Sequence, residues 1–136
     1  MTDETLFSRI AAGELPADIV YRDELVTAFR DISPRRPVHV LVVPNRVVPT
    51  ADDVGEIGDA EAERLLGRLL TVARRVARDE GVADDGYRLV INCREHGRQE
   101  VAHLHLHLLG GADCGPMIGP VASADASTDA STDAGG

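Results

Sequence analysis

The stretch VAHLHLHLLGG, residues 101–111, alternates histidine with leucine and ends in two glycines. Because successive side chains of a strand point to opposite faces, this alternation predicts a strand over 103–109 with its leucines on the buried face. His103, His105 and His107 then share the other face, displayed at steps of about 6.6–7 Å. Three of the five histidines of the chain lie within these five residues. Such a concentration indicates a functional cluster rather than an incidental polar surface.

Three imidazoles on one face suit either of two chemistries. A neutral imidazole is a nucleophile whose tautomer a neighbouring ring or carbonyl can fix. Imidazole nitrogen also ligates zinc, copper or nickel. A metal site would need further ligands nearby, yet the chain has no CxxC or HxxxH motif, and Cys93 and Cys114 lie in different segments. The residues alone therefore favour catalysis and leave a strand-based metal-binding protein as the alternative.

The rest of the chain predicts an α+β domain. Apolar residues at helical spacing, with Glu and Arg opposite, predict a long helix over 60–78. The other predicted elements are a short N-terminal helix stopped by Gly13 and strands over 19–21, 25–29, 38–43 and 87–92. Hairpin-length links between the early strands favour a mainly antiparallel, five-stranded sheet.

The composition bears on which partners the protein can bind and on the kind of organism it comes from. The formal charge is −9, which disfavours binding to nucleic acid because that binding depends on neutralising phosphates. All 14 basic residues are arginine. An acidic excess without lysine is typical of a halophilic archaeon, although a GC-rich genome would also replace lysine by arginine.

Chain organisation predicts one domain over 1–120 and an acidic low-complexity tail over 121–136. The tail repeats Ser, Thr, Asp and Ala, has few apolar residues and is expected to be disordered. Asp3 and Glu4 stand where a signal peptide would carry positive charge, and no apolar run is as long as a membrane span. We therefore expect a cytoplasmic protein without a membrane partner.

With its histidine strand the sequence resembles the histidine triad (HIT) family, whose signature alternates three histidines with apolar residues. Residues 6–17 (LFSRIAAGELPA) are similar to the family's opening helix and turn. Residues 29–34 with 37–44 resemble its nucleotide-binding loop and following strand, and 87–92 (YRLVIN) the strand that carries a site asparagine. The resemblance extends over 5–120 and implies a HIT-like fold.

The resemblance implies a hydrolase or transferase that releases a nucleoside 5′-monophosphate through a nucleotidyl-histidine intermediate, without a cofactor. His105 matches the histidine that attacks the α-phosphorus, and His103 the one that sets the geometry around it. His107 and His39 match two further histidines that hydrogen-bond around the phosphate and the nucleophile.

The resemblance also implies the substrate-binding residues. Asp31 matches a carboxylate that binds the ribose hydroxyls, although without the resemblance it is better interpreted as a turn residue before Pro34. The amides of Asn92 and Gln99 match positions on the phosphate side. The expected apolar walls around the base are Leu6, Phe7, Ile10, Phe29 and Ile32. Broad apolar walls favour a purine.

The segment before the histidines departs from the family pattern. Hydrolase-branch members usually have Gly-Gln-Ser or Gly-Gln-Thr where this chain has Arg98, Gln99 and Glu100. The usual hydroxyl donates a hydrogen bond toward the leaving group, and an ionised carboxylate cannot donate. Either Arg98 pairs with Glu100 over the phosphates and rewires the leaving-group site, or the chain binds nucleotides with weak turnover.

The resemblance finally bears on assembly and on structural metal. It implies a homodimer formed through the long helix and the strand near 87–92, for which Leu66, Leu70 and Ala77 offer apolar surface. Some family members build a structural zinc site from an N-terminal Cys-x-x-Cys. Residues 6–9 contain no cysteine, so no structural metal is expected.

Overall fold

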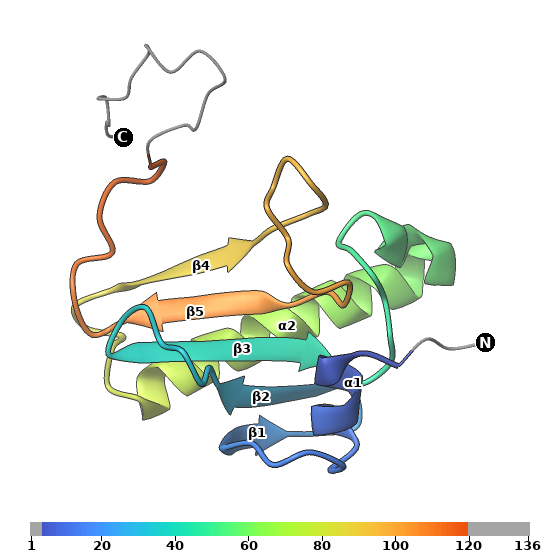
Figure 1. The fold of residues 1–136 in the computed structure, drawn as a ribbon, viewed down its shortest axis with the longest axis horizontal. Helices are drawn as coiled ribbons and strands as arrows, with labels where there is room; N and C mark the ends of the chain where they lie inside the picture. The colour runs from blue at the N-terminus through green and yellow to red at the C-terminus, as the bar shows by residue number, and fades with distance from the viewer. Residues whose placement is uncertain (1–3, 120–136) are drawn as a thin grey trace.

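The computed structural model describes residues 4–119, which form one five-stranded antiparallel sheet with a helix on each face (Figure 1). The elements are α1 (Leu6–Ala11), β1 (Ile19–Arg22), β2 (Val26–Arg30), β3 (Val38–Pro44), a 3-10 helix η1 (Asp53–Ile57), α2 (Asp59–Asp79), β4 (Tyr87–Ile91) and β5 (Leu106–Gly110). The strand order is β1-β2-β3-β5-β4, and every neighbouring pair is antiparallel. The predicted α+β class, with one long and one short helix, is confirmed. The predicted tail over 121–136 lies outside the described residues.

The long helix α2 covers one face of the sheet and forms most of the core. Its buried stripe is Ala62, Leu65, Leu69, Val72, Ala73, Val76 and Ala77. These side chains pack on the alternate residues of β2, β3 and β5 that face them, such as Val40, Leu106 and Leu108. Burying a leucine or valine in this way contributes about 1.5–3 kcal/mol per side chain. None of the described helices is long and apolar enough to span a membrane.

The short helix α1 covers the opposite face. Figure 1 shows α1 in front of the sheet and α2 behind it. Thr5 caps α1, because its hydroxyl accepts a hydrogen bond from the backbone N–H of Ser8 (2.9 Å). Phe7 and Ile10 of this helix pack against Phe29, Leu41 and Val43 in a second, smaller apolar cluster.

This second cluster corrects one expectation about the histidine strand. The histidines do lie on the face opposite the leucines, but they are not displayed on an open surface. His103 is 0% exposed and His105 is 5% exposed, because α1 and the second cluster cover that face.

The strand itself is shorter than predicted. β5 begins at Leu106, so His103 and His105 precede the ladder with β3 and β4. The alternation of faces continues through this segment, since Leu104 is buried in the α2 core with Leu106 and Leu108. The backbone N–H of Leu104 is satisfied instead by the carbonyl of Val48 (2.7 Å).

Candidate active site

A pocket of about 490 Å³ opens on the α1 side of the sheet and brings together most of the predicted site residues. It lies between α1, the end of β2, the loop that leads into β3, and the start of β5. Its polar lining includes Asp31, Arg35, Glu100, His105 and His107. All five predicted base-wall residues line it: Leu6, Phe7, Ile10, Phe29 and Ile32. Ile32 is 93% exposed and therefore forms the rim rather than the floor.

His105 is held with one ring nitrogen free. Its Nδ1 lies 2.7 Å from the backbone carbonyl of His103. A carbonyl only accepts, so Nδ1 carries the proton and Nε2 has a lone pair. Within residues 4–119 no hydrogen bond occupies that Nε2. The edge of the Phe7 ring packs against the imidazole, with centroids 5.0 Å apart. The geometry is that of an oriented nitrogen nucleophile beside a pocket.

His39 and His107 form a second ordered pair. The backbone N–H of Arg35 donates to Nδ1 of His39 (3.1 Å), so the neutral His39 ring carries its proton on Nε2. That Nε2–H lies 3.1 Å from Nδ1 of His107 and 3.4 Å from Oδ2 of Asp31. His107 therefore accepts at Nδ1 and keeps its own proton on Nε2, from which it can donate to a substrate oxygen.

The burial of these rings keeps them neutral. Burial, and then the neighbouring His105 and His39 rings, lowers the pKa of His107 to about 4. Burial is also the main cause that lowers the pKa of His39; the Asp31 carboxylate opposes it, and the Arg35 guanidinium adds to it. At neutral pH, both rings act as neutral hydrogen-bonding groups.

His103 is bound at both ring nitrogens and does not line the pocket. Its Nδ1 is 2.7 Å from the hydroxyl of Thr5, and its Nε2 is 2.9 Å from the carbonyl of Pro44. Burial is the largest effect on the ring and lowers the pKa of His103. His103 can influence the pocket only through the groups that it holds.

Asp31 forms the expected turn and also lines the pocket. One carboxylate oxygen accepts a hydrogen bond from the backbone N–H of Ser33 (2.9 Å), which makes the expected turn. The other oxygen lies beside His39, and the side chain lines the pocket. A carboxylate in this place can accept hydrogen bonds from two vicinal hydroxyls.

Besides His103 and His39, three further residues of the predicted site do not line the pocket. Asn92 follows the last residue of β4 and does not line the cavity. The amide of Gln99 is occupied by the backbone: it accepts from the N–H of Arg94 (2.8 Å) and donates to the carbonyls of Pro49 (2.7 Å) and Val101 (2.9 Å). Gln99 thus links the backbone of three loop residues and does not face the pocket.

Arg98 is the third of these residues, and the expected Arg98–Glu100 ion pair does not form. Glu100 lines the pocket but Arg98 does not, and neither takes part in an ion pair within the described residues. The backbone explains the usual glycine at this position. The φ of Arg98 is +62°, in the left-handed region that glycine adopts without strain.

Sequence reasoning missed the parts of the site that act through backbone groups or through helix capping. The N–H of Arg35 fixes the His39 ring, and nothing in the side-chain pattern reveals this role. The hydroxyl of Thr5, which caps α1, also reaches His103. Leu15, Pro16, Ala17 and Leu41 complete the apolar lining.

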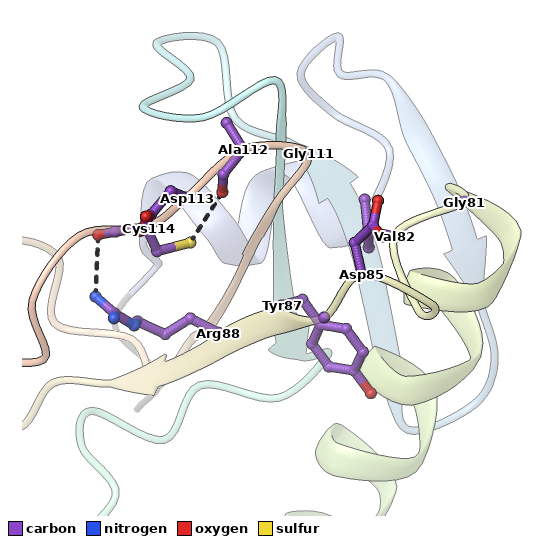
Figure 2. Close-up of a pocket in the computed structure, with 10 residues that line it drawn as sticks. Gly81, Val82, Asp85, Tyr87, Arg88, Gly111, Ala112, Asp113 and Cys114 are labelled. Atoms are coloured by element: carbon purple, nitrogen blue, oxygen red, sulfur yellow. Dashed lines mark hydrogen bonds between the residues drawn. The ribbon is translucent and has the colours of Figure 1, made fainter.

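A second hollow, of about 580 Å³, lies where β4 begins and β5 ends (Figure 2). No histidine lines it, and Asp85 and Asp113 are among its lining residues. The Arg88 guanidinium is occupied by the carbonyls of Cys114 (3.2 Å), Gly115 (2.7 Å) and Pro116 (3.1 Å), and Figure 2 shows it directed at Cys114. Without a free cation, this hollow is unsuited to a phosphate.

The comparisons with known proteins identify the family of the chain. The HIT domain family matches residues 12–114, so the chain belongs to the HIT domain family. The chain is 56% identical to the purine nucleoside phosphoramidase of Escherichia coli (strain K12) over 87% of this chain and 96% of that protein. A HIT family hydrolase from Clostridium thermocellum has a TM-score of 0.78 at 41% identity, over 87% of this chain and 99% of that one. The HIT family hydrolase of Legionella pneumophila Philadelphia 1 gives a TM-score of 0.75 at 43% identity, over 81% of this chain and 95% of that one.

Proposed function

We propose that this protein cleaves a purine nucleoside 5′-monophosphate from its leaving group through a covalent nucleotidyl-His105 intermediate. The observation that carries the proposal is the His105 ring, whose Nδ1–H is bound to the His103 carbonyl and whose Nε2 is free beside the pocket. The E. coli relative, named a purine nucleoside phosphoramidase, supports an amine leaving group and a purine base.

The reaction proceeds in two displacements at phosphorus. Nε2 of His105 attacks the α-phosphorus, a P–N bond forms, and the bond to the leaving group breaks with its electron pair. The leaving group takes a proton from solvent water as it departs, and the water that attacks in the second step returns a proton to solvent. Water then attacks the same phosphorus, the P–N bond breaks, and the nucleoside monophosphate leaves while His105 returns to its neutral form. The Nε2–H of His107 is a donor for the phosphoryl oxygens in both steps.

The pocket provides binding groups for the remainder of the substrate. Its volume of about 490 Å³ is in the range of small-ligand sites. Phe7, Ile10, Phe29 and Asp31 line the pocket; the first three suit an apolar wall for the base, and a carboxylate such as that of Asp31 can accept from the ribose hydroxyls. Since binding uses these groups as well as the histidines, loss of the nucleophile should affect turnover more than affinity.

Glu100 favours a second candidate, a nucleotide-binding protein with little turnover. Glu100 lines the same pocket as His105 and His107, and no arginine of the described residues pairs with it. An ionised carboxylate there repels the phosphate and cannot donate to a leaving group. The metal-binding alternative gains no support, because residues 4–119 contain no group of three side chains placed to hold a metal ion.

A fluorogenic purine nucleoside phosphoramidate separates enzyme from binding protein. We expect the wild-type protein to release the amine, and samples quenched in alkaline denaturant, in which the P–N bond survives, to carry a nucleotidyl group on His105 by mass spectrometry. His105→Gly should abolish turnover while nucleotide affinity, measured by calorimetry, stays within about tenfold. His96→Gly is the matched control, since His96 is exposed and does not line the pocket. Wild-type turnover by His105→Gly protein would rule out the covalent route, and tight binding without turnover would establish the second candidate.

A further inference from the structure

The starting point is that His103 is deeply buried and yet fully hydrogen-bonded. The residue is 0% exposed and does not line the pocket, so its ring does not touch a substrate there. Both ring nitrogens nevertheless have a partner: the Thr5 hydroxyl at Nδ1 (2.7 Å) and the Pro44 carbonyl at Nε2 (2.9 Å). A buried polar ring with two specific partners has a defined orientation.

The partners determine where each proton lies. The Pro44 carbonyl only accepts, so Nε2 of His103 carries the ring proton. Burial lowers the pKa of the ring, which leaves Nδ1 as a lone pair that needs a donor. The Thr5 hydroxyl is that donor. Its oxygen can still accept from the N–H of Ser8 (2.9 Å), so one hydroxyl serves both His103 and the helix cap.

The position of His103 matters because its backbone carbonyl holds the nucleophile. That carbonyl accepts the Nδ1–H of His105 at 2.7 Å. His103 precedes β5, which begins at Leu106, so no ladder partner on β3 or β4 fixes this carbonyl. The ring contacts to Thr5 and Pro44 supply part of the missing restraint.

We propose that Thr5 is a positioning residue for the nucleophile: its hydroxyl holds His103 as the Nε2–H tautomer and thereby fixes the carbonyl that orients His105. The role rests on the proposed function for its effect on turnover, but the tautomer of His103 is a property of the free protein. Thr5 acts through His103 and does not itself contact the substrate.

Three substitutions separate donation from capping. Thr5→Ser keeps both the donor and the cap, whereas Thr5→Val removes both at nearly constant shape. Thr5→Asp keeps a capping acceptor but cannot donate to Nδ1. Ser8→Ala is the matched control, because it removes the other half of the capping box without touching His103.

The first measurement is the long-range ¹H–¹⁵N spectrum of the imidazoles in the free protein. We expect wild-type, Thr5→Ser and Ser8→Ala proteins to show His103 protonated at Nε2 only. Thr5→Asp should convert His103 to the doubly protonated ring, since a carboxylate stabilises a proton on Nδ1. Thr5→Val should move the Nδ1 signal of His103 and the Nδ1–H signal of His105.

The second measurement is phosphoramidate turnover. Thr5→Val and Thr5→Asp should lower kcat by about tenfold or more with KM within about threefold, because a misplaced nucleophile affects the reacting geometry more than binding. Thr5→Ser should stay close to wild type. An inactive wild-type protein would refute the proposed function alone, and the spectra would still decide the role of Thr5. A wild-type His103 protonated at Nδ1, or spectral changes in Ser8→Ala equal to those in Thr5→Val, would overturn the inference.

Discussion

At the scale of single residues, the hydrogen-bond partners of the histidine rings decide what each ring can do. The alternation of the sequence places His103, His105 and His107 on one face, and the structure agrees. The partners that set the protonation of the rings come from distant segments. Thr5, the N-cap of α1, and Pro44 of β3 hold His103, and His107 faces His39, whose ring is fixed by the N–H of Arg35. Sequence spacing carries no information about such contacts, so the faces were predictable and the tautomers were not.

His107 makes the stability of the protein depend on pH in a defined window. Its pKa is lowered to about 4 in the folded chain, from a value near 6.5 when unfolded. The unfolded chain therefore binds more protons between these values, and the free energy of unfolding falls as pH decreases from about 6.5 to 4. For a partly exposed ring we expect a loss of roughly 1–2 kcal/mol after screening.

Urea unfolding at pH 7 and pH 4.5 tests this window. His107→Gln should lose less stability than wild type between the two pH values, because it has no ring to protonate. His96→Gln is the control and should follow wild type, since His96 is exposed. If wild type and His107→Gln lose the same unfolding free energy between pH 7 and pH 4.5, then His107 is not held neutral by burial.

Glu100 is the residue at which activity should be easiest to raise. Glu100→Ser removes a negative charge from the pocket lining and supplies a hydroxyl donor. One such donor at a developing charge is typically worth about 2–4 kcal/mol, so turnover of poor leaving groups should rise by at least tenfold. Good leaving groups should respond less, since they need little proton assistance.

The comparison that tests Glu100 uses a series of phosphoramidates whose amines differ in basicity. Glu100→Gln removes the charge and serves as the control for the hydroxyl. If Glu100→Ser lowers turnover on every substrate, Glu100 is itself a proton donor or an organiser of the site. The weakened leaving-group site would then be the wrong description.

At the scale of secondary-structure elements, predictions held where periodicity was strong and failed where the chain leaves a regular element. α2 was predicted over 60–78 and is observed over Asp59–Asp79. β5 was predicted from 103 but begins at Leu106, because the N–H of Leu104 pairs with Val48 instead of a neighbouring strand. The alternation of residue types in the sequence predicts which face of the sheet each side chain occupies, but it does not predict where backbone pairing between strands ends.

The loop before this segment contains a strained position that substitution can relieve. Arg98 has a φ of +62°, and a left-handed conformation costs a residue with a Cβ about 1–2 kcal/mol. Arg98→Gly removes that cost, although glycine also increases the entropy of the unfolded chain. We expect Arg98→Gly to be more stable than Arg98→Ala by about 1 kcal/mol in urea unfolding.

His96 supplies the matched comparison within the same loop. It is exposed and is not one of the described non-glycine residues with positive φ, so His96→Gly should be less stable than His96→Ala. The difference in unfolding free energy between the Gly and Ala variants should thus have opposite signs at positions 98 and 96. The same sign at both would mean that the Arg98 backbone is not held in the left-handed region.

At the scale of the whole molecule, the two edges of the sheet differ. β1 is a four-residue strand with an irregular register between Ile19 and Tyr21, and such irregularity protects an edge from pairing. β4 runs in continuous register with β5 from Tyr87 to Ile91, and no described strand pairs with its outer side. The strand order that exposes β4 was not predictable from strand spacing alone, because β5 inserts between β3 and β4.

The predicted homodimer would use this edge together with α2. Leu70 of α2 is 48% exposed and Ile91 of β4 is 36% exposed, whereas Ala77, expected to contribute, is fully buried in the core of its own chain. An exposed, regular edge strand and exposed apolar residues on α2 are suited to pairing with a second copy about a two-fold axis. Sedimentation should therefore show a species of twice the 14.5 kDa chain mass.

Leu70→Glu tests whether this surface makes the dimer. A charge at the centre of an apolar contact should shift the protein to the monomer at micromolar concentration. Molar salt should strengthen the wild-type dimer, because burial of apolar surface is favoured under salting-out conditions. Ile32→Glu is the matched control: Ile32 is even more exposed, at 93%, but lies at the rim of the pocket, so its substitution should leave the dimer intact. A wild-type protein that sediments only at 14.5 kDa in molar salt would refute the dimer, and dissociation by Ile32→Glu instead of Leu70→Glu would move the interface to the α1 side of the sheet.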